Sequence, residues 1–213
     1  MKVLSVLLLL LTGGFASLNA QPFHGGLLAG ISATQVDGDT YAGYDKAGLM
    51  GGVFVNTLFN DWFYGQFEIK YTGKGAKKPV SSNDPDVYTL ALHYIDMPLL
   101  VGAKIKKVAS VEIGLMPAYL FAANGETNLG KVSGKDLLES FKKFDFLFLA
   151  GVNIRLLEKL TFNVRYSYSL ASILKIDNQE TQGSYYNWFG RLFGRKAGEF
   201  NNDLTMAVYY QLK

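Results

Sequence analysis

Apolar and polar residues alternate along eight segments of this chain, so that every second residue is apolar or small and the charges fall on the other parity. The pattern is clearest where Phe162, Val164 and Tyr166 alternate with Asn163 and Arg165. A period of two is that of a β-strand, whose successive side chains point to opposite faces. The alternation predicts strands at about residues 24–34, 48–59, 62–73, 88–105, 109–122, 144–156, 160–172 and 203–213.

The connections between these segments alternate in length. Short turns are expected at Asn60-Asp61, at Lys106-Lys107 and at residues 157–159, whereas the other connections, such as 123–143 and 173–202, are long. An even number of strands with short turns at one end is typical of bacterial outer-membrane barrels. We therefore predict an all-β fold, an eight-stranded antiparallel up-and-down transmembrane β-barrel with short periplasmic turns and long outer loops.

The alternation alone leaves open which face points outward, because a lipocalin-type barrel carries its apolar side inside. The apolar face here holds large side chains such as Ile95, Met97 and Leu99, and an eight-stranded lumen has little room for them. The other parity is rich in small residues such as Gly102 and Gly114. Aromatic residues gather at the expected strand ends, where lipid headgroups would lie: Phe59, Trp62, Phe63, Tyr71, Tyr119, Phe121 and Tyr168. These observations favour a membrane barrel with its apolar face toward lipid.

The start of the chain predicts export. A basic residue, an apolar run over residues 3–11 and a small-residue stretch together indicate a secretory signal peptide over residues 1–20. Cleavage is expected after Ala20, with Ala16 as the alternative. Residues 21–213 would then form the barrel domain, located in the cell outer membrane.

Composition excludes several kinds of chemistry. The chain has no cysteine, which rules out a disulfide scaffold, a thiolate metal site and a catalytic cysteine. Its net charge of +3 is too small and too dispersed for a nucleic-acid partner. No phosphate-binding loop or metal-ligand spacing occurs, so we expect no cofactor and no metal.

Charged residues of both signs fall on the parity that should face the lumen. This predicted ion-pair network comprises Glu68, Lys70, Asp96, Lys104, Glu112, Asp145, Arg155 and Arg165. Charges in a narrow interior persist only when they are paired and hydrogen-bonded. We therefore expect a self-neutralising plug, and the alternative is a gated ion path, which would need an open lumen.

An outer-membrane lipid-modifying enzyme is a further alternative. Eight-stranded barrels of that kind need a membrane-facing histidine, and only His24 and His93 are present. His24 lies at the start of the first strand, and His93 lies beside Tyr94 on the lipid-facing parity. Neither position indicates catalysis, so we expect no enzyme activity.

The outer loops are better candidates for function, because barrels of this size act through what their loops present. The sequence from Ser133 to Phe141 predicts an N-cap followed by a short helix. The last loop carries aromatic and basic residues at helical spacing, and we take them as a candidate interaction surface: Tyr185, Tyr186, Trp188, Phe189, Arg191, Phe193 and Arg195. Such a stretch could cover the barrel mouth, lie on the outer leaflet or bind a partner protein.

Several motifs along the chain occur together in one known family. They are the opening Gly25 to Ile31, Phe67 to Gly75 (FEIKYTGKG), Tyr94 to Leu100 (YIDMPLL), Lys143 to Phe146 followed by Gly151, and Arg165 to Leu170 (RYSYSL). In this order and spacing the chain resembles the PorT-like outer-membrane β-barrel family. The resemblance implies an eight-stranded barrel, and the family's namesake takes part in protein secretion across the outer membrane by the type IX system.

Together these patterns predict a non-enzymatic scaffold or interaction barrel, with assistance to protein secretion as the resemblance implies. A small gated transport barrel is the alternative. The expected partners are outer-membrane lipid and lipopolysaccharide, and proteins of a secretion machinery or of the cell surface.

Overall fold

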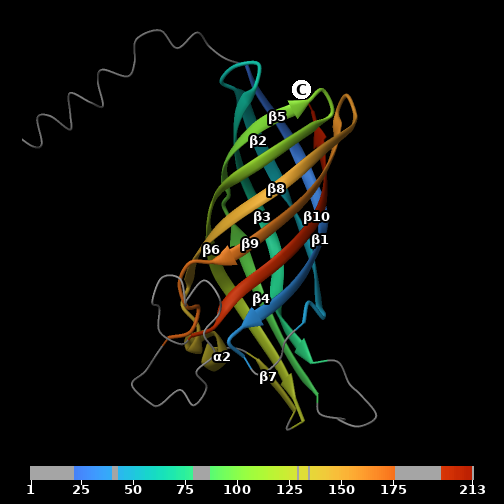
Figure 1. Cartoon of the computed structure of the whole chain (residues 1–213). Helices are drawn as coiled ribbons and strands as arrows, with labels where there is room; N and C mark the ends of the chain where they lie inside the picture. The colour runs from blue at the N-terminus through green and yellow to red at the C-terminus, as the bar shows by residue number, and fades with distance from the viewer. Residues whose placement is uncertain are drawn as a thin grey trace, which may run out of the picture.

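A computed structural model describes residues 22–39, 43–78, 87–128, 130–133, 135–175 and 198–212. They form one antiparallel sheet that closes into a tall ring (Figure 1). The strands are β1 (Phe23–Asp37), β2 (Lys46–Leu58), β3 (Phe63–Lys78), β4 (Tyr88–Asp96), β5 (Leu99–Lys106), β6 (Ala109–Thr127), β7 (Gly130–Ser133), β8 (Phe144–Leu157), β9 (Leu160–Ser169) and β10 (Phe200–Gln211), and the described part also contains the short helix α2 (Lys135–Ser140).

Strands β4 and β5 share one position in the ring, because both pair with β3 on one side and β6 on the other. The break between them falls at Met97-Pro98, since proline has no N–H to donate to the ladder. Hydrogen bonds continue across the break: Met97 N–H donates to the Pro117 carbonyl at 2.8 Å, and Glu68 N–H donates to the Pro98 carbonyl at 3.1 Å. The single strand predicted over residues 88–105 is therefore one interrupted strand.

The first and last strands close the ring. Strand β1 pairs with β2 on one side and with β10 on the other, in register from Gly26 opposite Gln211 to Asp37 opposite Phe200. Closure leaves no open sheet edge in the ring. At such an edge the backbone N–H and C=O groups would find no hydrogen-bond partner in lipid. The prediction of an eight-stranded up-and-down ring is confirmed, with β7 as an extra strand that pairs with β6 alone.

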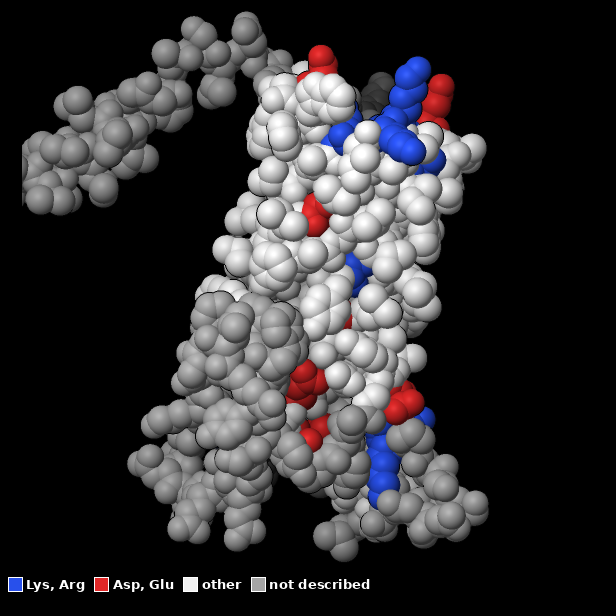
Figure 2. All heavy atoms as spheres, in the orientation of Figure 1, with Lys and Arg blue, Asp and Glu red and all other residues white. Residues whose placement is uncertain are grey.

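The apolar parity faces outward. Ile113 and Leu115 are 58% and 57% exposed, whereas Glu112 between the short turn and these residues is 2% exposed. The same holds for Leu99 and Val101 on β5. Figure 2 shows one face of the wall as largely uncharged, with basic and acidic atoms at the end that carries the short turns and others toward the long-loop end.

The described part of the chain contains no helix long and apolar enough to cross a membrane.

The two ends of the barrel differ as expected. At the short-turn end, Trp62 and Phe63 are exposed beside the first turn. At the long-loop end, Tyr119 contacts Phe144 with ring centroids 5.3 Å apart. The helix predicted after Ser133 is confirmed as α2, and the stretch before it is more regular than a loop because β6 continues to Thr127 and pairs with β7.

Candidate functional site

Arg165 of β9 reaches across the lumen and binds two carboxylates from other strands. Its Nη1 and Nη2 donate to the Glu68 Oε2 and Oε1 atoms at 3.0 and 2.9 Å, and its Nε donates to Glu112 Oε1 at 2.8 Å. All three side chains are buried. A planar guanidinium matches such a pair of acceptors, and charge-assisted bonds of this kind are among the strongest in proteins. We call these three residues with Lys70 the Arg165 clamp.

The remaining acceptor sites of the clamp are also filled. Glu68 receives hydrogen bonds from Gln66 at 2.7 Å and Tyr209 at 3.0 Å, and its Oε2 lies 3.4 Å from Lys70 Nζ. Glu112 receives hydrogen bonds from the side-chain amides of Asn153 at 2.8 Å and Asn163 at 2.9 Å. Gly151 makes room for this arrangement, because a Cβ there would lie 2.8 Å from Glu112 Oε1. Two acids and two bases balance in the clamp.

A second group of charges lies farther toward the long loops. Lys74 Nζ is 3.3 Å from Asp96 Oδ1 and 3.1 Å from Asp203 Oδ2, and it lies 5.0 Å from the centre of the Tyr94 ring. Ser167 donates a hydrogen bond to Asp203 at 3.2 Å. All of these side chains are buried.

Asp145 completes this second group. Its Oδ2 accepts hydrogen bonds from the Ser169 hydroxyl at 2.7 Å and the Asn201 amide at 2.9 Å. We call Lys74, Asp96, Asp145 and Asp203 the Lys74 cluster. It holds three acids and one base, so the buried charges of the described residues number five acidic and three basic, and this set differs from the four acids and four bases predicted.

Lys74 and Asp203 were absent from the predicted network: the third strand was expected to end at residue 73, one position before Lys74, and Asp203 was the first residue of the last predicted strand. Strand β3 continues to Lys78 and β10 begins at Phe200. Lys74 shares the inward parity of Glu68 and Lys70, and this parity was the signal that could have revealed it.

Two residues predicted for the network do not join it. Lys104 on β5 and Arg155 on β8 form no ion pair with any described residue. Both lie near the short turns, where they line a cavity of about 220 Å³. These cations thus lie in the opening at the short-turn end and not beside the buried carboxylates.

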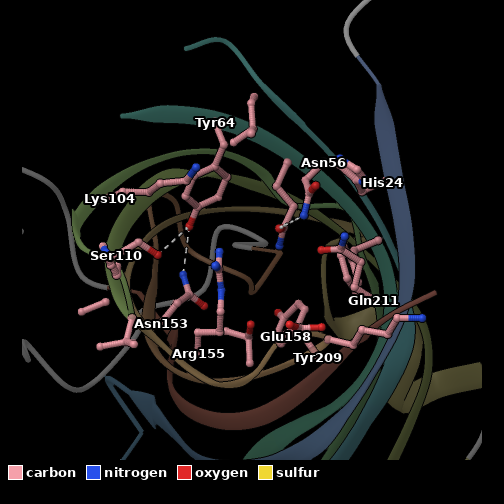
Figure 3. A pocket seen from close by; sticks show the side chains of 18 of the residues that line it. His24, Asn56, Tyr64, Lys104, Ser110, Asn153, Arg155, Glu158, Tyr209 and Gln211 are labelled. Atoms are coloured by element: carbon pink, nitrogen blue, oxygen red, sulfur yellow. Dashed lines mark hydrogen bonds between the residues drawn. The ribbon is translucent and has the colours of Figure 1, made fainter. Parts of the chain in front are cut away.

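This short-turn cavity is bordered by strand ends and turns (Figure 3). Tyr64 crosses its wall, with its hydroxyl 3.3 Å from the Ser110 hydroxyl and receiving a hydrogen bond from Asn153 at 3.0 Å. Gly102 permits this, because a Cβ there would collide with the Tyr64 ring. The other described lining residues include His24, Phe54, Asn56, Leu58, Gln66, Lys104, Lys106, Lys107, Val108, Ala109, Arg155, Glu158, Lys159, Thr161, Tyr209 and Gln211.

From its middle to the long-loop end, the lumen is filled largely by apolar side chains, although the inward parity was expected to be small or polar. Leu92, Leu120, Leu147 and Leu149 are almost fully buried, and Leu137 and Leu138 of α2 are packed against the same group. We call this group the apolar plug; it also contains Val36, Ala76, Leu90, Tyr94, Leu100, Met116, Ala118, Ala123, Phe141 and Ile173.

The histidines do not form a catalytic arrangement within the described residues. His93 Nδ1 lies 2.7 Å from the Tyr71 hydroxyl and its Nε2 lies 3.3 Å from the Asn124 amide. The hydrogen-bond partners of the His93 ring are thus the Tyr71 hydroxyl and the Asn124 side-chain amide. The described residues also contain no group of three or more side chains placed to hold a metal ion. The predicted interaction surface from Tyr185 to Arg195 lies outside the described residues.

The closed, filled barrel with a lipid-facing belt defines the class of the protein: it is an outer-membrane β-barrel. The chain belongs to the family described as "Outer membrane protein beta-barrel domain", whose model matches residues 15–175. The cell outer membrane is accordingly its location, and the short-turn end faces the periplasm by the rule for such barrels. No curated protein matches the chain.

Solved structures with a similar fold come from other bacteria. Ail, the attachment invasion locus protein of Yersinia pestis, is 13% identical with a TM-score of 0.52, and the match covers 89% of this chain and 98% of Ail. Neisserial surface protein A is 12% identical with a TM-score of 0.51, and the match covers 87% of this chain and 96% of that one. At these identities the likeness is one of fold.

Proposed function

We propose that this protein is a non-enzymatic scaffold or interaction barrel, which acts through the surfaces at its two ends and not by passing solutes. The observation that carries this proposal is the filling of the lumen. Between the two ends, the interior is occupied by the buried side chains of the Arg165 clamp, the Lys74 cluster and the apolar plug, which a solute would have to displace.

Breaking this path open would be costly. The clamp residues are held by one another and by Gln66 and Tyr209, so displacing any one of them leaves buried charge uncompensated. The apolar plug adds buried hydrocarbon surface, which does not replace the water around an ion. A gated transport barrel therefore has less support than a scaffold.

Protein secretion is the cellular role that we propose for the scaffold, on the strength of the PorT-like motifs. Its partners would then be components of a secretion machinery, with lipid and lipopolysaccharide around the wall. The outer surface would be presented by the last long loop, as the aromatic and basic residues between Tyr185 and Arg195 suggest from sequence.

Conductance measurements test the closed lumen. The purified protein, reconstituted in planar lipid bilayers beside a pore-forming barrel as positive control, should give no discrete openings. Steady single-channel conductance would instead make it a transport barrel.

A variant lacking residues 185–196 should still migrate as a heat-modifiable barrel but lose partners that co-purify from native outer membranes. Retention of the same partners would contradict a role for this loop.

A further inference from the structure

The short-turn cavity concentrates positive charge at the periplasmic end of the barrel. Five basic residues line it, namely Lys104, Lys106, Lys107, Arg155 and Lys159, against the single acid Glu158. They come from two neighbouring short turns, β5–β6 and β8–β9, and from the ends of β5 and β8 beside them. Figure 3 shows Arg155 directed into the opening, with Lys104 beside the Tyr64 ring.

This positive charge is not consumed by the acids deeper in the lumen. Glu68 and Glu112 already receive Arg165, and they fill their remaining acceptor sites with Tyr209, Asn153 and other neighbours. The clamp thereby forms a neutral floor under the cavity. A charged cleft with low-dielectric walls focuses its field on whatever enters it. An anion approaching from the periplasm is therefore attracted to the opening.

The walls of the cavity add groups suited to a peptide. Asn56 and Gln66 present side-chain amides, one donating to the other at 3.5 Å, and Tyr64 and Ser110 present hydroxyls. Phe54, Leu58 and Val108 contribute apolar surface. A volume of about 220 Å³ lies below the several hundred cubic ångströms of sites for drug-sized ligands. The space suits one or two side chains or a chain end.

We propose that the short-turn cavity binds the carboxylates of an acidic peptide segment presented from the periplasm. The wall amides and hydroxyls would bond the peptide backbone, while Lys104 and Arg155 would pair with carboxylates inside the opening. The lysines of the two turns would contact acidic residues that flank the inserted part. This inference concerns the periplasmic end and stands independently of any partner at the long loops.

Peptide binding to the detergent-solubilised full chain tests the proposal. Fluorescently labelled hexaglutamate should bind with an affinity that falls steeply as salt is raised, and hexaglutamine should not bind. In a Lys104→Gln/Arg155→Gln variant the Kd should rise roughly tenfold, the sum of two partly exposed ion pairs. The matched control is Lys131→Gln/Lys143→Gln, which removes the same charge from exposed positions at the long-loop end and should leave the Kd unchanged.

Three outcomes would overturn the proposal. Equal Kd values for the two double variants would show that net charge and not the cavity attracts the peptide. Binding of hexaglutamine as tight as that of hexaglutamate would remove the role of carboxylates. Displacement of hexaglutamate by inorganic phosphate at equal concentration would assign the cavity to small free anions. Heat-modifiable migration of each variant verifies that the barrel is folded.

Discussion

Arg165 shows how a single side chain can determine the character of the lumen. Its guanidinium joins Glu68 of β3 to Glu112 of β6, although neither strand is a neighbour of β9 in the ring. Glu68 and Glu112 lie 97 and 53 positions before Arg165 in the chain. Each charge is acceptable in the interior only because the others are present.

Removal of Arg165 alone should therefore be more damaging than removal of the whole group. We expect Arg165→Met to lower the free energy of unfolding by about 3–5 kcal/mol, because two buried carboxylates lose their main partner. Combining it with Glu68→Gln and Glu112→Gln should restore a large part of that loss. Urea titrations of tryptophan fluorescence in lipid vesicles measure both variants, with Lys143→Gln as a surface control. Additive losses would indicate a hydrated, open lumen.

Glu199, which precedes β10 at the long-loop end, gives a test by pH. Burial and the neighbouring charge of Asp39 raise the pKa of Glu199 to about 7. Between pH 4.5 and 7, Glu199 is therefore protonated in the folded state, whereas in the unfolded chain, where its pKa is the ordinary 4.5, it has lost its proton. Stability attributable to Glu199 is present below pH 4.5 and is lost as the pH rises through 7.

A Glu199→Gln variant should therefore gain stability relative to the wild type as the pH rises from 4.5 to 8. The difference in the free energy of unfolding at pH 4.5, 6 and 8 is the measurement. Glu139→Gln on the exposed face of α2 is the matched control and should show no such trend. A constant difference for Glu199→Gln across this range would contradict the raised pKa.

At the scale of elements, the strands act as two-sided units. Strand β6 turns Ile113 and Leu115 to the lipid while Glu112, Met116 and Ala118 enter the lumen. Its ends carry different partners: β5 and β8 near the short turn, and β4 and β7 near the long loops. One strand thus connects the clamp, the plug and the lipid belt.

Charge placed on the lipid-facing side of β6 should show the depth of each position. Ile113→Arg should cost about 2–4 kcal/mol of unfolding free energy, as arginine does near the bilayer midplane. Val108→Arg, in the short turn, should cost about 0–1 kcal/mol, because arginine near the interface reaches water. Urea titrations in vesicles compare the two variants. Equal costs would place Ile113 outside the hydrocarbon region.

At the scale of the whole molecule, closure of the ring divides the protein into two ends with different chemistry. The periplasmic end opens into a cationic cavity, whereas the other end is filled by the apolar plug and α2. The Arg165 clamp lies directly under the cavity, and the Lys74 cluster lies among the residues of the plug. This division is why the proposed function relies on surfaces, and why binding at the cavity and conductance through the lumen can be tested separately.

Strand positions, the lipid-facing parity and the barrel class were determined by the sequence, because a period of two assigns each side chain to a face without knowledge of its neighbours. Ile113 and Glu112 illustrate this, since their opposite exposures follow from parity alone. Loop lengths likewise indicated which end carries the short turns. Such local properties need no long-range contact.

Only the tertiary structure decided which charges meet. Glu68 and Arg165 lie across the lumen from one another, and closure of the ring, not strand adjacency, brings them together. Lys104 and Arg155 share the inward parity, yet their height along the barrel places them in the cavity. Leu147 and Leu149 share that parity too and form the apolar plug, because an inner wall crowded by neighbouring strands buries apolar and charged side chains alike.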